Sequence, residues 1–287
     1  MTDFSKEINN FILELENKND SKLFPYLLNK SWKPGEQIFY SGPYWDNTEV
    51  VSAMNALLGG QWLSAGENVE EFERKYSKKF KFSDSLMVNS GSSANLTMIA
   101  SLKEYYGWHD EDEIIVSSCG FPTTLNPIIQ NNLKPKLVDI SFTDLNWNTE
   151  DIVNSITPKT KAIFSSPVLG NPGDFQKIID IANSYNLQLI SDNCDSLGSK
   201  WNGKFLTEYS VASSCSFYPA HHLCTIEGGM VSSNIKSIID IARSIAWWGR
   251  ACYCKGSQNK LPNGACGKRF DYWMDGIDTI VDHKYVF

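Results

Sequence analysis

The sequence lacks a long apolar run. No stretch of its 287 residues approaches the roughly 18 apolar residues that a membrane-spanning helix needs. The first residues, from Met1 to Glu7, also lack the basic and apolar segments of a signal peptide. Lys and Arg number 26 against 33 Asp and Glu, giving a formal net charge of −7, which disfavours nonspecific nucleic-acid binding. These features predict a cytoplasmic protein that binds neither membrane nor nucleic acid.

Two common nucleotide-binding motifs are missing as well. The chain contains neither a Walker A loop nor a G-x-G-x-x-G sequence, so a nicotinamide-binding Rossmann domain has little support. It shows no internal repeat and no low-complexity tract. Its seven cysteines are an odd number without an export signal, which argues against a disulfide framework and leaves metal or cluster ligation open.

The hydrophobic pattern alternates between helical and strand periods. Strands that alternate with helices predict an α/β protein with a largely parallel sheet covered on both faces. The predicted helices are 4–15, 46–58, 69–80, 94–106 and 175–185, and the predicted strands are 85–88, 113–116, 136–138, 162–164, 188–191, 212–217 and 230–232.

Three polar or aromatic features stand where strands of this pattern end. Gly91, Ser92 and Ser93 precede a helix, whose free N–H groups suit a phosphate, although such a turn can simply cap the helix. Asp192 follows a strand, where a carboxylate can hold a pyridine nitrogen protonated, or can merely serve a loop or helix cap. Phe121 suits stacking on a flat heterocycle, with burial in the core as the alternative.

Residues 216–229 read SFYPAHHLCTIEGG and resemble the active-site stretch of the DegT/StrS (DegT/DnrJ) family of sugar enzymes, which use pyridoxal or pyridoxamine phosphate (PLP or PMP). The resemblance extends over most of the chain, from about Asp46 onward. It implies the large domain of a PLP-dependent aminotransferase (fold type I), a mostly parallel sheet flanked by helices. It also implies a phosphate site at Gly91, Ser92, Ser93 and Ser216, stacking by Phe121, and Asp192 at the pyridine nitrogen.

Where that family has a lysine, four residues after the phenylalanine, this chain has His221. An imidazole cannot form the covalent link to the cofactor aldehyde that a lysine amine forms, but it can move protons near neutral pH. A histidine here resembles the 3-dehydrase branch, which acts on nucleotide-linked 4-keto-6-deoxyhexoses. The resemblance implies noncovalently held PMP with His221 as the base, and we expect a structural role for His222.

Four cysteines form the pattern C-x57-C-x-C-x11-C: Cys194, Cys252, Cys254 and Cys266. The pattern resembles the iron–sulfur signature of the CDP-4-keto-6-deoxyglucose 3-dehydrase type, and four thiolates are the usual ligands of a [2Fe–2S] cluster. The interval before Cys266 is longer than in that type, and residues 255–265 are predicted to form an added loop. Inert buried cysteines or a structural zinc site are the alternatives.

The remaining cysteines, Cys119, Cys215 and Cys224, lie on or beside apolar stretches and are predicted to be packing residues. A cluster would pass electrons from an NAD(P)H-dependent flavin or iron–sulfur reductase, and the product would be a 3,6-dideoxy-4-keto sugar nucleotide. Such a product is a precursor of dideoxysugars in lipopolysaccharide and other surface polysaccharides.

The resemblance also predicts the domain organisation. We expect an N-terminal helical arm over residues 1–34, a cofactor-binding large domain over 35–287, and the absence of the family's smaller C-terminal domain. A homodimer is expected. Two other interpretations stay open: a cluster-free 3-dehydratase of the same fold that regenerates its amine from glutamate, and a noncatalytic fragment or partner-binding module with a structural zinc.

Overall fold

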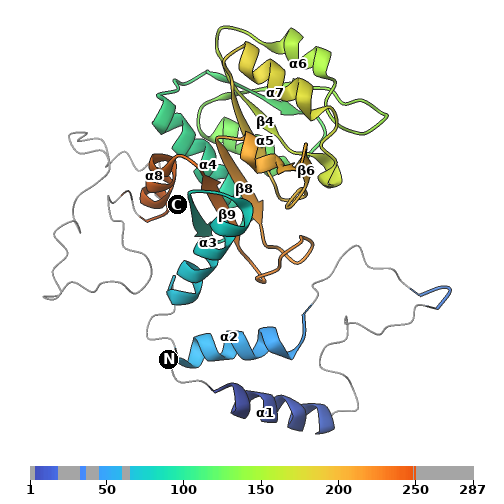
Figure 1. The fold of residues 1–287 in the computed structure, drawn as a ribbon, viewed down its shortest axis with the longest axis vertical. Helices are drawn as coiled ribbons and strands as arrows, with labels where there is room; N and C mark the ends of the chain where they lie inside the picture. The colour runs from blue at the N-terminus through green and yellow to red at the C-terminus, as the bar shows by residue number, and fades with distance from the viewer. Residues whose placement is uncertain (1–3, 19–32, 37–44, 60–64, 248, 250–287) are drawn as a thin grey trace, which may run out of the picture. The chain divides into compact units, whose positions relative to one another are not determined.

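The computed structural model describes residues 4–18, 33–36, 45–59, 65–247 and 249 (Figure 1). These residues divide into two compact units, one ending at Glu71 and the other beginning at Phe72. The first unit contains helices α1 (Ser5–Lys18) and α2 (Asn47–Gly59), which pack through Ile8, Ile12 and Val51. Both helices confirm predicted ones. The arm over residues 1–34 stays a prediction.

A seven-stranded sheet forms the centre of the second unit, with strand order β1-β9-β8-β5-β4-β2-β3. Strand β9 runs antiparallel to both of its neighbours, β1 and β8, and the other six strands share one direction. The mostly parallel sheet predicted from the sequence is confirmed. Its strands are β1 (Asp84–Val88), β2 (Glu113–Ser117), β3 (Lys134–Val138), β4 (Thr160–Ser165), β5 (Gln188–Asp192), β8 (Ala212–Ser216) and β9 (Gly229–Ser233), and a separate hairpin pairs β6 (Lys200–Trp201) with β7 (Lys204–Phe205).

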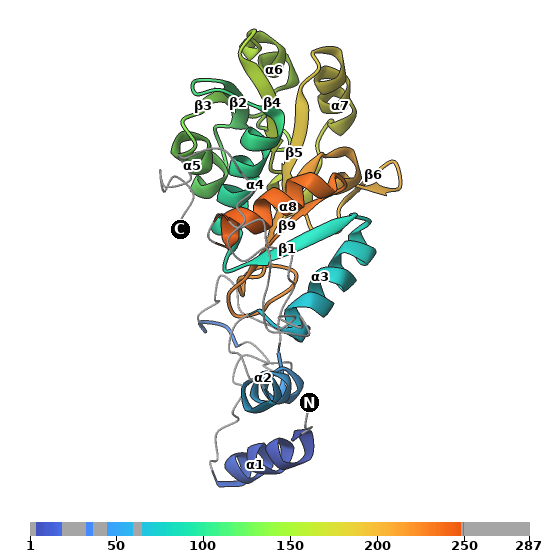
Figure 2. The ribbon, with the colours of Figure 1, turned by 90° about the vertical axis from the view of Figure 1, so that its left-hand side faces the viewer.

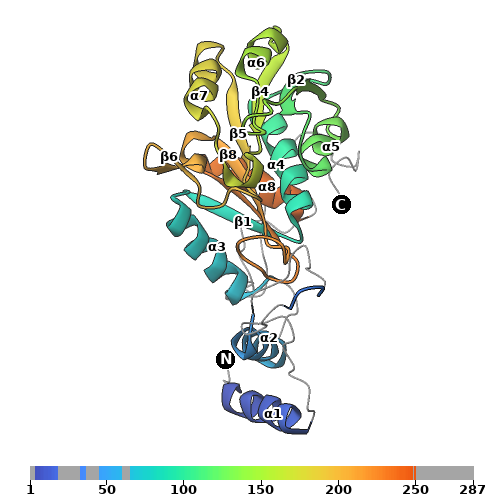
Figure 3. The same ribbon diagram turned by 90° about the vertical axis from the view of Figure 1, so that its right-hand side faces the viewer.

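Helices cover both faces of this sheet. Figure 2 shows α4, α5 and α8 on one side of the strands, and Figure 3 shows α7 and α4 on opposite sides of β4 and β5. The helices are α3 (Glu67–Phe80), α4 (Gly91–Tyr106), α5 (Pro122–Gln130), α6 (Thr149–Ser155), α7 (Phe175–Ser184) and α8 (Lys236–Ala246), with short 3-10 helices η1 (Val168–Gly170) and η2 (Leu206–Tyr209). None of the helices in the described part of the chain is long and apolar enough to cross a membrane.

Three of the α-helices, α5, α6 and α8, were not predicted from the sequence. Helix α5 contains Pro127 and starts at Pro122, and internal prolines normally indicate that a helix is interrupted. Helix α6 has only seven residues, which is too short for a clear periodic signal. Helix α8 follows a strand after a two-residue break, and its buried residues become apparent only once it packs on α4 and β1.

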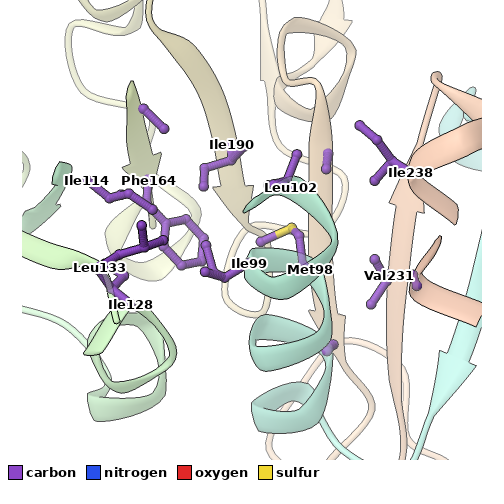
Figure 4. Packing of buried hydrophobic residues seen from close by; sticks show 14 of the residues in the cluster. Met98, Ile99, Leu102, Ile114, Ile128, Leu133, Phe164, Ile190, Val231 and Ile238 are labelled. Carbon is purple, nitrogen blue, oxygen red and sulfur yellow. The ribbon is translucent and has the colours of Figure 1, made fainter. Parts of the chain in front are cut away.

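Helix α4 is the centre of the largest hydrophobic core. Figure 4 shows its Met98, Ile99 and Leu102 between Phe164 on one side and Val231 on the other, and all five side chains are fully buried. Full burial of such a side chain contributes about 1.5–3 kcal/mol. The helix is fixed at its end by Gly107, which adopts the left-handed conformation (φ 64°) that favours glycine. The core contacts and this C-terminal cap together hold α4 against the strands.

A buried ion-pair cluster fastens α8 to the first strand and to α3. The Arg243 guanidinium lies 3.6 Å from the Glu73 carboxylate and 3.7 Å from that of Asp84, and donates to the Ser85 carbonyl at 3.4 Å. Glu73 also accepts from the backbone N–H of Met87 at 2.8 Å. The side chains of Arg243 and Glu73 are each 5% exposed. Removing one of these charges would therefore leave the other buried without a partner.

We expect Arg243→Met to lower the free energy of unfolding by about 3–5 kcal/mol, because it leaves the buried Glu73 carboxylate, and the partly buried one of Asp84, without their cation. Denaturant unfolding followed by circular dichroism measures the change. Lys177→Met is the matched control, since Lys177 pairs with Asp174 at the surface, with side chains 64% and 48% exposed. That variant should change stability by less than about 1 kcal/mol, and equal losses in the two variants would contradict the prediction.

Candidate active site

A buried carboxylate stands at the carboxyl end of β5. The Oδ2 atom of Asp192 accepts hydrogen bonds from Asn95 Nδ2 at 2.8 Å and from Thr124 Oγ1 at 2.7 Å, and its Oδ1 accepts from the backbone N–H of Cys194 at 3.2 Å. Asp192 is 4% exposed, and within the described ranges no basic side chain forms an ion pair with it. A buried carboxylate with only neutral donors is well suited to a cationic partner.

Asn95 and Thr124 were missed as site residues in the sequence. Asn95 is 1% exposed in the middle of α4, and its Oδ1 accepts from Ser214 Oγ at 2.5 Å. An amide inside an otherwise apolar helix face is a signal that could have pointed to it, because buried polar groups need partners. Thr124 lies in the first turn of α5, a helix that the sequence did not predict.

The predicted phosphate turn begins α4, next to the end of β8. The Ser90 side chain caps the helix by accepting from the Ser93 N–H at 3.1 Å. A Cβ on Gly91 would lie 2.4 Å from Cβ of Ser216, and one on Gly229 would lie 2.1 Å from the Ser90 carbonyl oxygen. Glycine at these positions lets the start of α4 approach the end of β8 and the beginning of β9. The structure thus brings Gly91 and Ser216 together, and their role in binding a phosphate stays a prediction.

Phe121 lies in the loop between the end of β2 and the start of α5. It precedes α5 as its N-cap residue and is 69% exposed. This exposure excludes the buried-core alternative and leaves the ring free to stack. The Ser92 hydroxyl, on the first turn of α4, lies 3.3 Å from the Thr123 hydroxyl of α5. The two helix starts therefore face the same end of the sheet.

His221 lies in the turn that follows β8. Its backbone N–H donates to the Tyr218 carbonyl at 2.9 Å, and its Nδ1 atom is 3.5 Å from Oδ1 of Asp195. The imidazole is 20% exposed, so it is partly shielded yet reachable, whereas His222 is exposed. The first histidine is thus the one held in a defined position.

Ile226, in the loop between β8 and β9, has a strained backbone. Its φ is 69° and the residue is 77% exposed. A β-branched residue with positive φ is an outlier, and the left-handed region costs about 1–2 kcal/mol for residues other than glycine. The loop holds this conformation through a hydrogen bond from the Thr225 hydroxyl to the Glu227 carbonyl at 2.9 Å and a Thr225 N–H bond to the Phe217 carbonyl at 2.9 Å.

Ile226→Gly is expected to raise the free energy of unfolding by about 1 kcal/mol, because glycine relieves the strain and little burial is lost. Thermal and denaturant unfolding measure the gain. Ile226→Ala keeps the Cβ atom and should show almost none of it. A glycine variant no more stable than the alanine variant would mean that the loop carries no strain.

The cysteines fall into different environments. Cys194, two residues after Asp192, is half-buried, and burial together with the Asp192 carboxylate raises the pKa of its thiol; a bound metal would deprotonate it outright. Cys252, Cys254 and Cys266 lie outside the described residues. Over the ranges that are described, no group of three or more His, Cys, Asp or Glu residues is placed to hold a metal.

Of the three cysteines predicted to pack, Cys215 is buried among aromatic residues and confirms the prediction, and Cys224 is half-buried. Cys119 is exposed, so the packing prediction is wrong there. It follows β2 by two residues, in the loop before α5, where the chain leaves the core.

Brief iodoacetamide treatment of the native chain at pH 8 should modify Cys119 rapidly and Cys215 not at all. Burial raises the pKa of Cys215 to about 12, so its reactive thiolate is scarce. Mass spectrometry of the peptides reads both sites, and denaturant should make Cys215 react. Equal labelling of the two cysteines in the native chain would show that β8 is not buried.

The chain is similar to known proteins over most of its length. The chain is 36% identical over 251 residues to dTDP-4-dehydro-2,6-dideoxy-D-glucose 3-dehydratase of Saccharopolyspora spinosa, covering 86% of the chain and 53% of that protein. It is 36% identical over 244 residues to the lipopolysaccharide biosynthesis protein RfbH of Salmonella typhimurium, covering 83% and 54%. The chain thus spans about half the length of these curated relatives.

A solved structure agrees with the fold. That structure, of E. coli GDP-4-keto-6-deoxy-D-mannose-3-dehydratase with bound hydrated PLP, superposes with a TM-score of 0.70 at 33% identity, covering 75% of this chain and 56% of the other. The predicted fold of PLP-dependent aminotransferases is confirmed. The model of the DegT/DnrJ/EryC1/StrS aminotransferase family matches residues 45–270, so the chain belongs to that family.

Proposed function

We propose that the chain is the cofactor-binding part of a PMP-dependent 3-dehydrase that removes the C3 hydroxyl of a nucleotide-linked 4-keto-6-deoxyhexose. The observation that carries the proposal is His221, an imidazole held at the strand ends where the family's aminotransferases have a lysine. The names of two relatives, which are sugar 3-dehydratases, support the proposal. A histidine there supports proton transfer without a covalent link to the cofactor.

The residues at the strand ends fit the cofactor. The first turn of α4, with Ser92 and Ser93, offers donors to a phosphate, and Ser216 lies against Gly91 at the same point. Asp192 supplies a buried negative charge for a protonated ring nitrogen, and Phe121 offers an exposed aromatic face. The bound group would supply an electron sink for bond cleavage, and the protein's part is to orient it and keep its ring protonated.

His221 has the position and the chemistry of a base. It is reachable, partly shielded from water, and lies in the turn directly after Ser216 and β8. In this proposal it takes a proton from the reacting centre and returns it to the departing hydroxyl. A second solved structure supports the substrate class, because it is a GDP-4-keto-6-deoxymannose-3-dehydratase variant with bound GDP-perosamine, at 30% identity and a TM-score of 0.71.

We further propose that Cys194, Cys252, Cys254 and Cys266 hold a [2Fe–2S] cluster. Cys194 is bonded through its N–H to Asp192, which would put the cluster beside the cofactor ring. An NAD(P)H-dependent flavin or iron–sulfur reductase would supply the electrons. The relative RfbH is named a lipopolysaccharide biosynthesis protein, which supports a role in dideoxysugar formation. The same proposal includes a cytoplasmic homodimer.

One observation favours a second candidate, a cluster-free 3-dehydratase that regenerates its amine from glutamate. A solved GDP-4-keto-6-deoxymannose-3-dehydratase, 33% identical to this chain, holds PLP and glutamate trapped together. The two candidates share His221 and the cofactor residues. They differ in iron and in the source of electrons.

Anaerobic purification, iron, zinc and sulfide assays, a visible spectrum and a PMP titration test the proposal. We expect PMP binding with about two iron and two sulfide per chain. PMP binding with no metal would favour the cluster-free candidate. Zinc in place of iron would remove the electron route, and a folded chain that binds no PMP would overturn the proposed function altogether.

A further inference from the structure

Two carboxylates, Asp192 and Asp195, lie close together in the chain at the end of β5, and they have different surroundings. Asp192 ends β5, and Asp195 follows three residues later. Oδ1 of Asp195 lies 3.5 Å from Nδ1 of His221. In the described part of the chain, Asp195 is the one acidic residue within ion-pair distance of this imidazole. The second carboxylate thus faces the candidate base.

The turn that places Asp195 is rigidly held. The N–H of Asn193 donates to the Ser214 carbonyl at 3.0 Å, and the Ser196 hydroxyl donates to Asn193 Oδ1 at 2.6 Å. Asn193 is 1% exposed and Ser196 2%. The first bond joins the turn to β8, the strand that precedes the His221 turn, and the second closes the turn on itself. The backbone of the turn that carries Asp195 is therefore anchored to β8.

The orientation of the pair has a chemical consequence. A neutral imidazole carries its proton on one nitrogen, and the partner of that nitrogen decides which one. A carboxylate opposite Nδ1 favours the proton there, which leaves the lone pair on Nε2 for use as a base. The side chain of Asp195 is 54% exposed, so the pair adds little stability, and its effect lies in orientation.

We infer that Asp195 is a positioning residue that keeps His221 in the tautomer with Nδ1 protonated and Nε2 free to accept a proton. The inference rests on the proposed function, because it assigns a partner to the proposed base. It does not need a bound cofactor to be tested. A surface ion pair without a role would leave the tautomer unchanged when Asp195 is removed.

The test is ¹⁵N NMR of the whole chain with labelled histidine, recorded with the imidazole neutral, and with the His221 signals assigned by their loss in His221→Gln. We expect the Nδ1–H tautomer to predominate in the native chain and its ratio to the other form to fall at least about threefold in Asp195→Ala. Asp195→Glu should restore most of the ratio. Asp110→Asn is the matched control, because Asp110 is a paired carboxylate of similar exposure, 59%, and should change nothing.

An equal tautomer ratio in the native chain and in Asp195→Ala would overturn the inference. Should Asp195→Ala fail to fold, Asp195→Ser removes the same charge with a smaller change in polarity and decides the matter. A PMP titration of the same samples separates the two claims. Absence of PMP binding in the native chain counts against the proposed function, whereas the tautomer ratio alone decides the role of Asp195.

Discussion

Asp192→Asn should weaken PMP binding roughly ten- to hundredfold, because a hydrogen bond involving a charged group contributes about 1.5–3 kcal/mol. The asparagine keeps the shape of the side chain and an oxygen for Asn95 and Thr124, which donate to Asp192 at 2.8 and 2.7 Å. It removes the negative charge that a protonated ring nitrogen needs. Titration of the chain with PMP, followed by absorbance, measures the dissociation constant.

Asp139→Asn is the matched control for this prediction. Asp139 directly follows β3 at the same end of the sheet, but it is exposed and its Oδ1 accepts from the Ser118 hydroxyl at 3.4 Å. Its neutralisation should leave the PMP affinity unchanged. An Asp192→Asn variant that folds and binds PMP as tightly as the native chain would show that Asp192 does not contact the ring.

Gly229→Ala should lower the free energy of unfolding by about 3 kcal/mol or more, which is a large part of the roughly 5–15 kcal/mol typical of a domain. A Cβ there would lie 2.1 Å from the Ser90 carbonyl oxygen and 2.8 Å from the backbone nitrogen of Gly91. Gly229 also pairs with Val88 of β1 and with Ser216 of β8. Because all of these contacts are with backbone or paired strands, nothing nearby can move cheaply. Denaturant unfolding measures the loss.

Gly120→Ala serves as the control for this substitution. A Cβ on Gly120 would meet no atom within 4 Å, and its φ lies outside the positive range, so stability should change by less than about 1 kcal/mol. If Gly229→Ala were as stable as Gly120→Ala, then α4 would not begin against β9 as described. The proposed phosphate site would lose its structural basis as well.

The periodic patterns determined much of the fold, because buried parallel strands and amphipathic helices leave strong local signals. Predicted strands such as 188–191 and 230–232 lie within β5 and β9. The local patterns did not predict that β9 runs against its neighbours. Strand direction depends on how a connection returns across the sheet, and no short sequence window records that. Helix α5 was missed for a related reason, since Pro127 is tolerated by its packing rather than by its propensity.

The sequence by itself determined the family resemblance, the histidine at residue 221 and the Gly/Ser turn at Gly91, because each depends on residue type at a fixed spacing. Only the tertiary structure decided what surrounds them. Asn95 and Thr124 reach Asp192 from 97 and 68 residues away in the chain. Asp195, which follows β5, lies 3.5 Å from His221, which follows the neighbouring strand β8. Such contacts come from the convergence of strand ends at one edge of the sheet, so the order of neighbours along the chain does not contain them.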